Sequence, residues 1–573
     1  MDVFDCSRGI VALPMIGLAA AALLYFLYNL ALPKPLPGIP YSKEASRRLF
    51  GDVKEMRKAK YRRQWVWSQP REHHAPVVQL FLFPFRRPSV VVTDYYEAVD
   101  ICSRRLKEFD RGTRNKECVG LMAPNFHFTM ESRDPRLSYH RDLIRDLMTP
   151  KFLNEVSAPR VYERVVALIE LWDLKTTKAC GRPFSANHDL YLATLDIISS
   201  VAFDMEDENT ALRHEIAHVQ SLNHGVSRVL DDPVEFPPGP TDPEVEALLN
   251  IPEMVSIAQA SPFPTFSQMV AMLKPKHAQA QWNRHALIKR QTDRSLRKLA
   301  ATGSSGCESA LDQLIWREMN AAKKAGRAAN YYSPEIRDEV LGYLLAGHDT
   351  TATVTSWWIK YMTRHQSVQE RLRNELRQAH SNAHQEGRWP TKDEVCAASI
   401  PYFYAVMEET LRYSSVATLI IRTATCDTQI LGYPIPKGTD VILPLRGPSV
   451  TEPAVPISDA SRPSSYKDAK ERIPYWGDDV DQFKPERWLK TSTNSDGTKE
   501  EVYDANAGPN LAFSAGPRQC FGKRLAYLEL KIIMTILLWN FEFEPMNDTL
   551  NSSEITERLV NLPKDCYAKL KRL

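Results

Sequence analysis

The chain has few cysteines for its length and no strong excess of charge. Its 573 residues include nine cysteines, an odd number, and no two of them have CxxC spacing. This argues against a disulfide framework or a zinc ribbon and suits a reducing compartment. Because 73 Lys and Arg nearly balance 70 Asp and Glu, the net charge is only +3, which speaks against nucleic-acid binding. With 43% hydrophobic and 25% charged residues, most of the chain must fold into a globule with a core.

Residues 9–32 contain no charged side chain. A helix of this length, at about 1.5 Å per residue, can cross a hydrocarbon core of roughly 30 Å, so we expect an uncleaved transmembrane anchor. A cleaved signal peptide or a buried core helix fits less well, because acidic residues precede a long apolar run. Four basic residues against one acid in 34–48 place the bulk of the chain in the cytosol. Residues 1–8 would then be lumenal.

A proline-rich segment follows the predicted anchor. Four prolines between Pro33 and Pro40 forbid a helix and favour a stiff linker over residues 33–50. Beyond it, residues 51–573 show neither a repeat nor a change in composition, and we expect one catalytic domain, mainly helical with a small sheet. The clearest helical patterns are Tyr139–Met148, Val161–Trp172, Ser333–Met362, Val368–His380, Pro401–Tyr413 and Arg524–Asn540, and the clearest strands are Val77–Phe83, Ser89–Thr93 and Thr425–Ile430.

The stretch HEIAHVQSLNH fits the HExxH pattern of zinc hydrolases. Helical spacing would put His214 and His218 on one face with Glu215 beside them, as zinc-dependent hydrolysis requires. The longer pattern needs a glycine turn before its third histidine, and here Ser221 stands in that place before His224. A zinc hydrolase is therefore the weaker alternative, and a polar helix face explains the match.

A second stretch, FSAGPRQCFGKR at 513–524, places one cysteine among glycines, a proline and basic residues. A helix that starts near Phe521 would direct free backbone N–H groups at Cys520 and favour its thiolate form. Gly516 permits a tight turn close to a flat ligand, and Gly522 leaves the first helical turn clear. A thiolate with open space beside it suits haem iron better than the alternative, an inert buried thiol.

These residues match the haem-binding pattern FxxGxRxCxG, and the chain resembles the cytochrome P-450 family. The resemblance implies a mainly α fold with a small β-sheet region and heme b (haem below) as the cofactor, with Cys520 as the axial iron ligand. It implies that Phe513 packs near the thiolate, that Arg518 reaches a haem propionate, and that Gly516 and Gly522 belong to the cofactor-binding loop.

Further marks of the family stand upstream. EETLR supplies Glu409 and Arg412, three residues apart on one helical face, where a buried bidentate ion pair can form. The resemblance implies that Arg487 of FKPERW completes a structural triad with this pair, and that Arg422 contacts a propionate. The pair alone has little weight, since helices contain many such pairs, and Arg487 alone could belong to a polar turn.

AGHDTT, residues 346–351, interrupts an apolar helical pattern that opens with Ser333 as N-cap and proline after it. Thr350 can donate a hydrogen bond to the carbonyl four residues earlier and loosen the helix there. A plain helix irregularity is the alternative. The resemblance implies that Asp349 and Thr350 are the catalytic acid and alcohol that relay protons to dioxygen, and that Ala346 lies at the cofactor.

One family mark is imperfect. The WxxxR pattern of the helix that crosses the haem propionates finds its arginine at Arg145, but Arg141 or His140 stands in place of tryptophan. The resemblance implies that Arg145 contacts a propionate.

The sequence thus predicts a membrane-anchored haem-thiolate monooxygenase on the cytosolic face of the endoplasmic reticulum. The resemblance implies that it takes electrons from NADPH through a flavin reductase, NADPH-cytochrome P-450 reductase, with cytochrome b5 as a second donor, and inserts one oxygen atom from O2 into an organic molecule. Lys523 and Arg524 would form part of a positive face for the reductase. Apolar residues around 344–346 and 416–421 favour a lipophilic secondary metabolite. A non-catalytic haem sensor or carrier is a further alternative, and it would need no Asp349 and Thr350.

Overall fold

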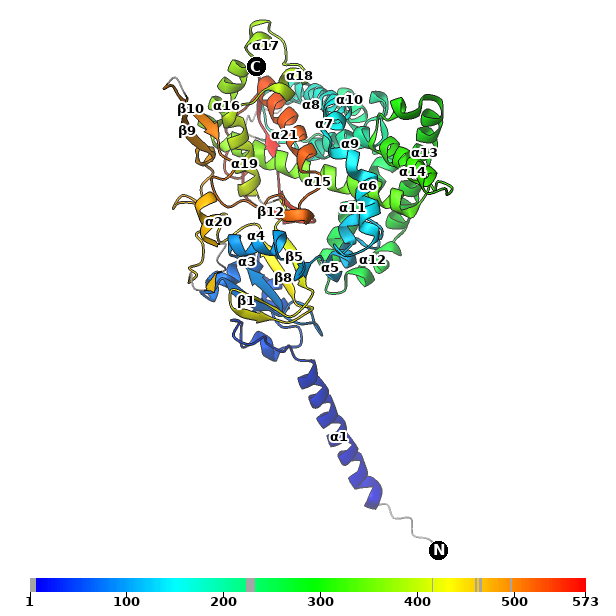
Figure 1. Cartoon of the computed structure of the whole chain (residues 1–573), viewed down its shortest axis with the longest axis vertical. Helices are drawn as coiled ribbons and strands as arrows, with labels where there is room; N and C mark the ends of the chain where they lie inside the picture. Colours follow the sequence, from blue (N-terminus) through cyan, green and yellow to red (C-terminus); the bar gives the residue numbers. More distant parts are fainter. Residues whose placement is uncertain (1–6, 223–231, 415, 459–460, 463–465, 495–496) are drawn as a thin grey trace.

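The computed structural model describes residues 7–222, 232–414, 416–458, 461–462, 466–494 and 497–573. The chain is mainly helical and carries several short sheets, which confirms the predicted fold class. Figure 1 shows a large helical body and, below it, a smaller region that contains the main sheet, from which α1 (Ser7–Ala31) extends away.

The main sheet has five strands in the order β1-β2-β8-β5-β3. The pairing of β2 with β8 is parallel and the other pairings are antiparallel. Every residue of β1 and β2 is buried, so these valine-rich strands are covered on both faces. The strands are β1 (Val77–Leu80), β2 (Ser89–Val92), β8 (Asp440–Pro444), β5 (Leu419–Ala424) and β3 (Phe109–Asp110).

Five two-stranded sheets make up the rest of the β structure in the described residues. The predicted strand Thr425–Ile430 is shorter than expected, because only Thr428–Ile430 pairs with a neighbour. The pairs are β4 (Phe184–Ser185) with β14 (Tyr567–Ala568), β6 (Thr428–Ile430) with β7 (Tyr433–Ile435), β9 (Leu489–Thr493) with β10 (Lys499–Tyr503), β11 (Phe541–Phe543) with β15 (Leu570–Arg572), and β12 (Ile555–Glu557) with β13 (Asn561–Pro563).

The long helix α15 (Pro334–Arg364) runs through the helical body. Its start is as predicted: the Ser333 hydroxyl accepts a hydrogen bond from the Ile336 amide, and proline follows at the first helical position. The helix packs most extensively against α9 (Asn187–Phe203). Gly347 allows this approach, because a Cβ at that position would lie 2.5 Å from the Ile198 side chain.

The other predicted helices are present, with ends shifted by a few residues. They are α6 (Arg136–Ile144), which continues as the 3₁₀ turn η3 (Arg145–Met148), α8 (Ala158–Ala179), α16 (Gln366–Ala379), α19 (Pro401–Ser414) and α21 (Lys523–Asn540). The remaining helices are α2 (Val53–Lys58), α3 (Arg62–Glu72), α4 (Tyr95–Ser103), α5 (Thr113–Val119), α7 (Pro150–Phe152), α10 (Ala211–Ser221), α11 (Pro243–Gln259), α12 (Pro264–Met272), α13 (Pro275–Thr302), α14 (Ala310–Lys324), α17 (Ser381–Gln385), α18 (Lys392–Ala397) and α20 (Tyr466–Arg472).

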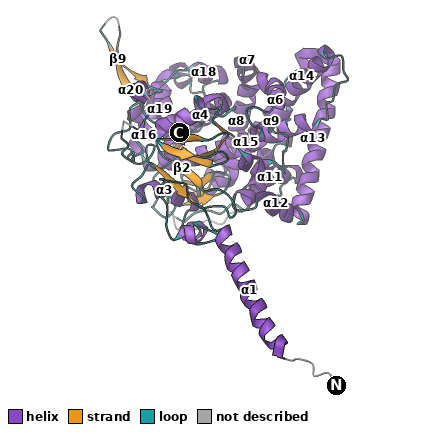
Figure 2. Cartoon of the chain, turned by 60° about the horizontal axis from the view of Figure 1, so that its bottom comes forward, coloured by secondary structure: helices purple, strands orange, loops and turns teal. Residues whose placement is uncertain are grey.

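Helix α1 covers most of the predicted membrane segment 9–32 and lies apart from the body in both views (Figure 1, Figure 2). Nine large apolar side chains between Met15 and Leu30 are 45% to 72% exposed. Within the described part of the chain, no helix has both the length and the apolar character that a membrane crossing needs. The predicted transmembrane span is therefore not confirmed.

Candidate active site

Cys520 lies in a tight loop just before α21. Gly516 has a φ of +70°, and a Cβ there would come within 2.3 Å of the Cys102 carbonyl oxygen at the end of α4. Glycine is thus required both by conformation and by close packing. The Cys520 amide donates to the Phe513 carbonyl (2.9 Å) and closes the loop, while the Phe513 ring packs against Tyr527 with 5.4 Å between centroids.

The Cys520 side chain is exposed, whereas the thiols of Cys102 and Cys566 are buried. A Cβ on Gly522, the N-cap residue of α21, would have the cysteine sulfur at 4.0 Å as its nearest neighbour. Desolvation by the surrounding protein raises the pKa of the Cys520 thiol, and the opposing effects of the Gly522 amide, Arg111 and Lys523 offset this only in part. A bound metal cation would favour the thiolate further. The accessible sulfur and the clear space beside it fit a haem iron ligand.

Four arginines gather beside this loop: Arg111, Arg141, Arg422 and Arg518. Arg111 Nη2 donates to the Arg518 carbonyl (3.3 Å), Arg141 Nη2 to the Pro517 carbonyl (3.1 Å), and Arg518 Nη2 to the Met130 carbonyl (2.7 Å). Burial, together with repulsion from Arg141 and Arg422, lowers the pKa of Arg518 to about 10, although the nearby Asp110 acts in the opposite direction. The cluster is thus rich in positive charge, which Asp110 neutralises only in part.

An anionic ligand would stabilise this cluster. Arg422 Nε and Arg518 Nη1 are buried and have no hydrogen-bond partner among the described residues, and unpaired buried donors cost free energy. The carboxylate of Asp110 is already engaged by Ser132 and the Arg111 amide. The two propionates of haem supply the missing acceptors, so the residues present fit this cofactor.

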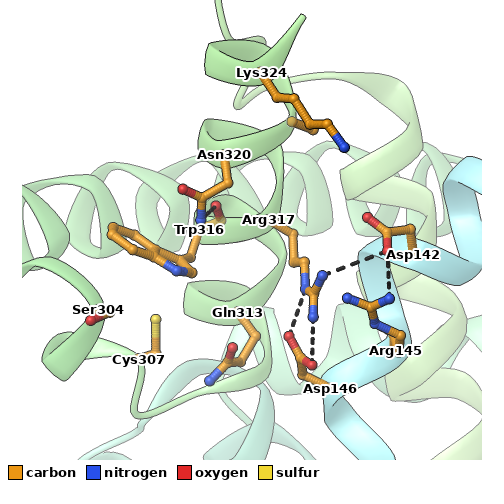
Figure 3. Close-up of a pocket in the computed structure, with 11 residues that line it drawn as sticks. Asp142, Arg145, Asp146, Ser304, Cys307, Gln313, Trp316, Arg317, Asn320 and Lys324 are labelled. Carbon is orange, nitrogen blue, oxygen red and sulfur yellow. Dashed lines mark hydrogen bonds and ion pairs between the residues drawn. The ribbon is translucent and has the colours of Figure 1, made fainter.

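Arg145 does not join the cluster, which differs from the sequence prediction. Its side chain is 63% exposed, lies 3.4 Å from Asp142 and lines a surface pocket of about 630 Å³ (Figure 3). Across this pocket, Arg317 of α14 pairs with Asp146 at 2.6 Å. The chain tightens from α to 3₁₀ geometry at Arg145, so this side chain leaves the helix face that carries Arg141.

His140 does not face the cysteine loop either. Its ring is fully buried, and its Nδ1 lies 2.7 Å from a carboxylate oxygen of Glu339 on α15. The other oxygen of Glu339 lies 2.8 Å from Nδ1 of His127. Of the two residues considered in place of the family tryptophan, Arg141 is the one that reaches the loop.

A less buried stripe follows one face of α15. Tyr343, Gly347 and Thr350 are half-buried and Ala346 is exposed, although nearly all their neighbours along the helix are buried. The Thr350 hydroxyl donates to the Ala346 carbonyl at 2.7 Å, which confirms the predicted hydrogen bond. The helix nevertheless continues through this segment without a break. Asp349, in contrast, is buried.

The structure brings Glu409, Arg412 and Arg487 together at the end of α19. Glu409 and Arg412 are fully buried, with a shortest contact of 2.7 Å between Oε1 and Nη2. Arg487 Nε lies 3.1 Å from Glu409, and the indole of Trp488 donates to the same carboxylate at 2.9 Å. Arg412 also donates to three backbone carbonyls, those of Val450, Val480 and Gln482. The group joins segments up to about 80 residues apart in sequence.

The HEIAH segment lies in α10 and has a different role. Glu215 is buried and accepts from the Gly239 amide at 3.0 Å, and His218 Nε2 lies 3.1 Å from the Pro237 carbonyl. His214 is exposed on the helix surface, and His224 lies outside the described residues. No group of three metal-ligating side chains is found among the residues that the structure describes. The segment therefore secures the loop before α11.

We expect His218→Ala to leave haem content and oxygenase turnover unchanged. Its loss removes one hydrogen bond to a loop, which costs about 0.5–1.5 kcal/mol of stability. The measurements are metal analysis and product formation per haem. One equivalent of zinc that disappears in the variant would instead support the hydrolase alternative.

Two residues near AGHDTT carry no motif and were missed by sequence reasoning. The Tyr191 hydroxyl donates to Asp349 Oδ1 at 2.8 Å. Glu529 of α21 accepts from the Thr351 hydroxyl at 2.8 Å, and burial raises its pKa to about 8. A lone acid in the apolar α21 was a visible signal for Glu529. Tyr191 gives no such signal, since tyrosine is common in buried helices.

Comparisons with known proteins agree with this geometry. A family model described as "Cytochrome P450" matches residues 45–449 and 472–570. The chain is 36% identical over 576 residues to "Cytochrome P450 monooxygenase TRI13" of Fusarium sporotrichioides, with 96% of this chain and 97% of the relative covered. It is 36% identical over 570 residues to "Cytochrome P450 monooxygenase GME11363" of Pestalotiopsis microspora (97% and 98% covered), and 31% identical over 558 residues to "Cytochrome P450 monooxygenase xilC" of Penicillium crustosum (96% and 94%).

Proposed function

The chain belongs to the cytochrome P450 family and is a haem-thiolate monooxygenase, and we propose that it inserts one oxygen atom from O2 into a lipophilic secondary metabolite of a fungus. The observation that carries the reaction class is the accessible Cys520 sulfur beside an arginine cluster in which buried N–H groups of Arg422 and Arg518 have no partner among the described residues. A zinc hydrolase is not favoured, because the HEIAH side chains hold a loop.

Each part of the site has a defined task in this proposal. Cys520 would ligate the haem iron, and Arg111, Arg141, Arg422 and Arg518 would hold the propionates. Haem, when bound, supplies the oxygen chemistry, for which the protein provides position, charge and protons. The Thr350 hydroxyl donates its hydrogen to a backbone carbonyl, so its oxygen lone pairs are free to accept a hydrogen bond from water.

Substrate and electron donor follow from the surroundings of the site. The apolar residues at 344–346 and 416–421 suit a terpenoid or polyketide better than a charged metabolite. We propose electron supply from NADPH through a flavin reductase, with cytochrome b5 as a possible second donor. Lys523 and Arg524 are exposed next to the cysteine loop and would attract an acidic partner.

We also propose attachment to the cytosolic face of the endoplasmic reticulum membrane. The exposed apolar side chains of α1 support it. A second exposed apolar group on and next to α12 also supports it, and comprises Phe263, Phe266, Met269, Val270 and Leu273.

In cells, Asn547 tests the orientation: it is exposed and opens an NDT sequon, whereas Asn551 is 4% exposed and poorly placed for a glycan. A glycan on Asn547 would show that the catalytic domain faces the lumen and not the cytosol. Recovery of the chain in the membrane-free fraction would contradict the proposed attachment.

The reaction class is tested by reducing the purified protein under carbon monoxide. Thiolate ligation gives the ferrous carbonyl complex a strongly red-shifted Soret band. Metal analysis should find iron as haem and no stoichiometric zinc. An unshifted band would withdraw the thiolate assignment, and zinc without haem would favour the hydrolase.

Thr350→Val tests the proton relay. Valine nearly preserves the side-chain shape, so the lost hydrogen bond costs only about 0.5–1.5 kcal/mol of stability. If the hydroxyl organises protons, haem binding, substrate binding and reduction stay near normal, while product formed per NADPH consumed falls by about tenfold or more as electrons go to hydrogen peroxide. Thr355→Val, which removes a similar hydroxyl-to-carbonyl bond five residues later, is the control. An unchanged ratio in Thr350→Val would remove Thr350 from the mechanism.

A further inference from the structure

Asp349 is held from a second helix. The hydroxyl of Tyr191, on α9, donates to Asp349 Oδ1 at 2.8 Å. The other carboxylate oxygen, Oδ2, is buried and has no hydrogen-bond partner among the described residues. Asp349 is 2% exposed, so its orientation is set by this one bond and by packing.

The approach of α9 to α15 makes this bond possible. Gly347 stands two residues before Asp349, and any larger residue there would collide with Ile198 of α9. The two helices therefore come close enough for Tyr191 to reach Asp349. The glycine of AGHDTT thus admits the neighbouring helix.

Among the described residues around Asp349, Tyr191 is the one that hydrogen-bonds to its carboxylate and so orients it. Burial lowers the pKa of the adjacent His348, so its ring is neutral at physiological pH, and its Nδ1 faces the Leu344 carbonyl at 3.1 Å. Desolvation and the nearby Asp349 raise the pKa of Tyr191 far above its ordinary value, so its hydroxyl keeps its proton. A buried carboxylate with one neutral donor on Oδ1 and nothing on Oδ2 has one oxygen available for proton exchange.

We propose that Tyr191 is the positioning residue of proton delivery in this enzyme. By donating to Oδ1, it fixes the Asp349 carboxyl group so that Oδ2 is the oxygen that takes up and releases a proton during turnover. Tyr191 is half-buried, and it thus links the buried acid to a more accessible part of α9. This inference rests on the proposed monooxygenase function and adds to it a residue on another helix.

The test uses the haem-loaded full chain with Tyr191→Phe, which removes one oxygen atom and keeps the ring. We expect haem content, the ferrous carbonyl band and substrate affinity to stay at wild-type values, while product per NADPH falls by about tenfold. The solvent deuterium isotope effect on product formation should rise in the variant, because proton delivery then limits turnover. A role in packing alone would change stability and leave both quantities unaltered.

Two comparisons make the result specific. Tyr402→Phe removes another tyrosine-to-carboxylate bond, 2.9 Å to Glu486, away from Asp349, and should not change product per NADPH. In an Asp349→Asn background, Tyr191→Phe should cause no further fall in product per NADPH. The effects of the two substitutions on the free energy of unfolding should be non-additive in the double variant. Wild-type coupling in Tyr191→Phe, or a full second loss in the double variant, would overturn the positioning role. A wild-type protein without any oxygenase activity would instead refute the proposed function.

Discussion

Cys520→His should abolish the red-shifted ferrous carbonyl band and monooxygenase turnover together. Imidazole can bind haem iron, but it is a neutral ligand without the electron donation that favours O–O cleavage. The loop geometry remains suited to a side chain at this position, because Gly516 and Gly522 create the turn and the space. We therefore expect haem to remain partly bound, with an unshifted Soret band, and product formation to fall below detection.

The control for this experiment is Cys180→Ser. Cys180 is also exposed, but its sulfur contacts the carbonyls of Thr177 and Lys178 at the end of α8. Spectrum and turnover should match the wild type. A red-shifted band that persists in Cys520→His would show that another residue ligates the iron, and the assignment of the loop would fall.

The cysteine loop was predictable because its chemistry is local. The motif residues stand within ten positions of one another: Phe513, Gly516, Arg518, Cys520 and Gly522. Each residue type is explained by a local requirement, namely a turn, a close approach of the backbone or a ligand. The capped start of α15 and the Thr350 hydrogen bond are local in the same sense. For such features, spacing in sequence determines distance in space.

The arginine cluster beside the cysteine loop was only partly predictable. Arg422 and Arg518, which the sequence predicts to contact propionates, both lie in the cluster. Arg111, just after β3, belongs to no motif, and Arg141 rather than Arg145 reaches the cysteine loop. The different directions of the Arg141 and Arg145 side chains depend on where α6 changes to a 3₁₀ turn. A change of pitch by one residue redirects a side chain, and sequence patterns do not locate such changes to one residue.

Contacts between distant helices could not be found from the sequence. Tyr191 and Asp349 are 158 residues apart, and Thr351 and Glu529 are 178 apart. Neither pair has a spacing rule, because the distance is set by how α9 and α21 pack against α15. HEIAH shows the opposite situation, in which sequence spacing misleads. Its spacing fits a metal site, but Glu215 and His218 form hydrogen bonds with the backbone of a neighbouring loop.

Glu409→Gln should destabilise the protein more than any other change considered. Glu409 is fully buried and accepts hydrogen bonds from Arg412, Arg487, Trp488 and the Lys484 amide. Glutamine keeps the shape but removes the negative charge, so the buried Arg412 loses its ion pair with this carboxylate, whereas Arg487 keeps its ion pair with Asp479 at 2.9 Å. Breaking a buried pair in this way costs about 3–5 kcal/mol, a large fraction of a typical total stability of about 5–15 kcal/mol.

The free energy of unfolding should be measured by urea titration, with haem absorbance and far-UV circular dichroism as two probes. Glu244→Gln is the control, since it neutralises an acid paired with Arg290 at 2.5 Å on the surface, where solvent screens the charges and the loss is small. The contrast matters because both variants remove one carboxylate from an arginine pair, but Glu409 is buried and has further hydrogen-bond donors. A Glu409→Gln protein as stable as Glu244→Gln would mean that the backbone carbonyls around Arg412 suffice to stabilise its charge, and that the triad does not hold α19 to the segment 479–488.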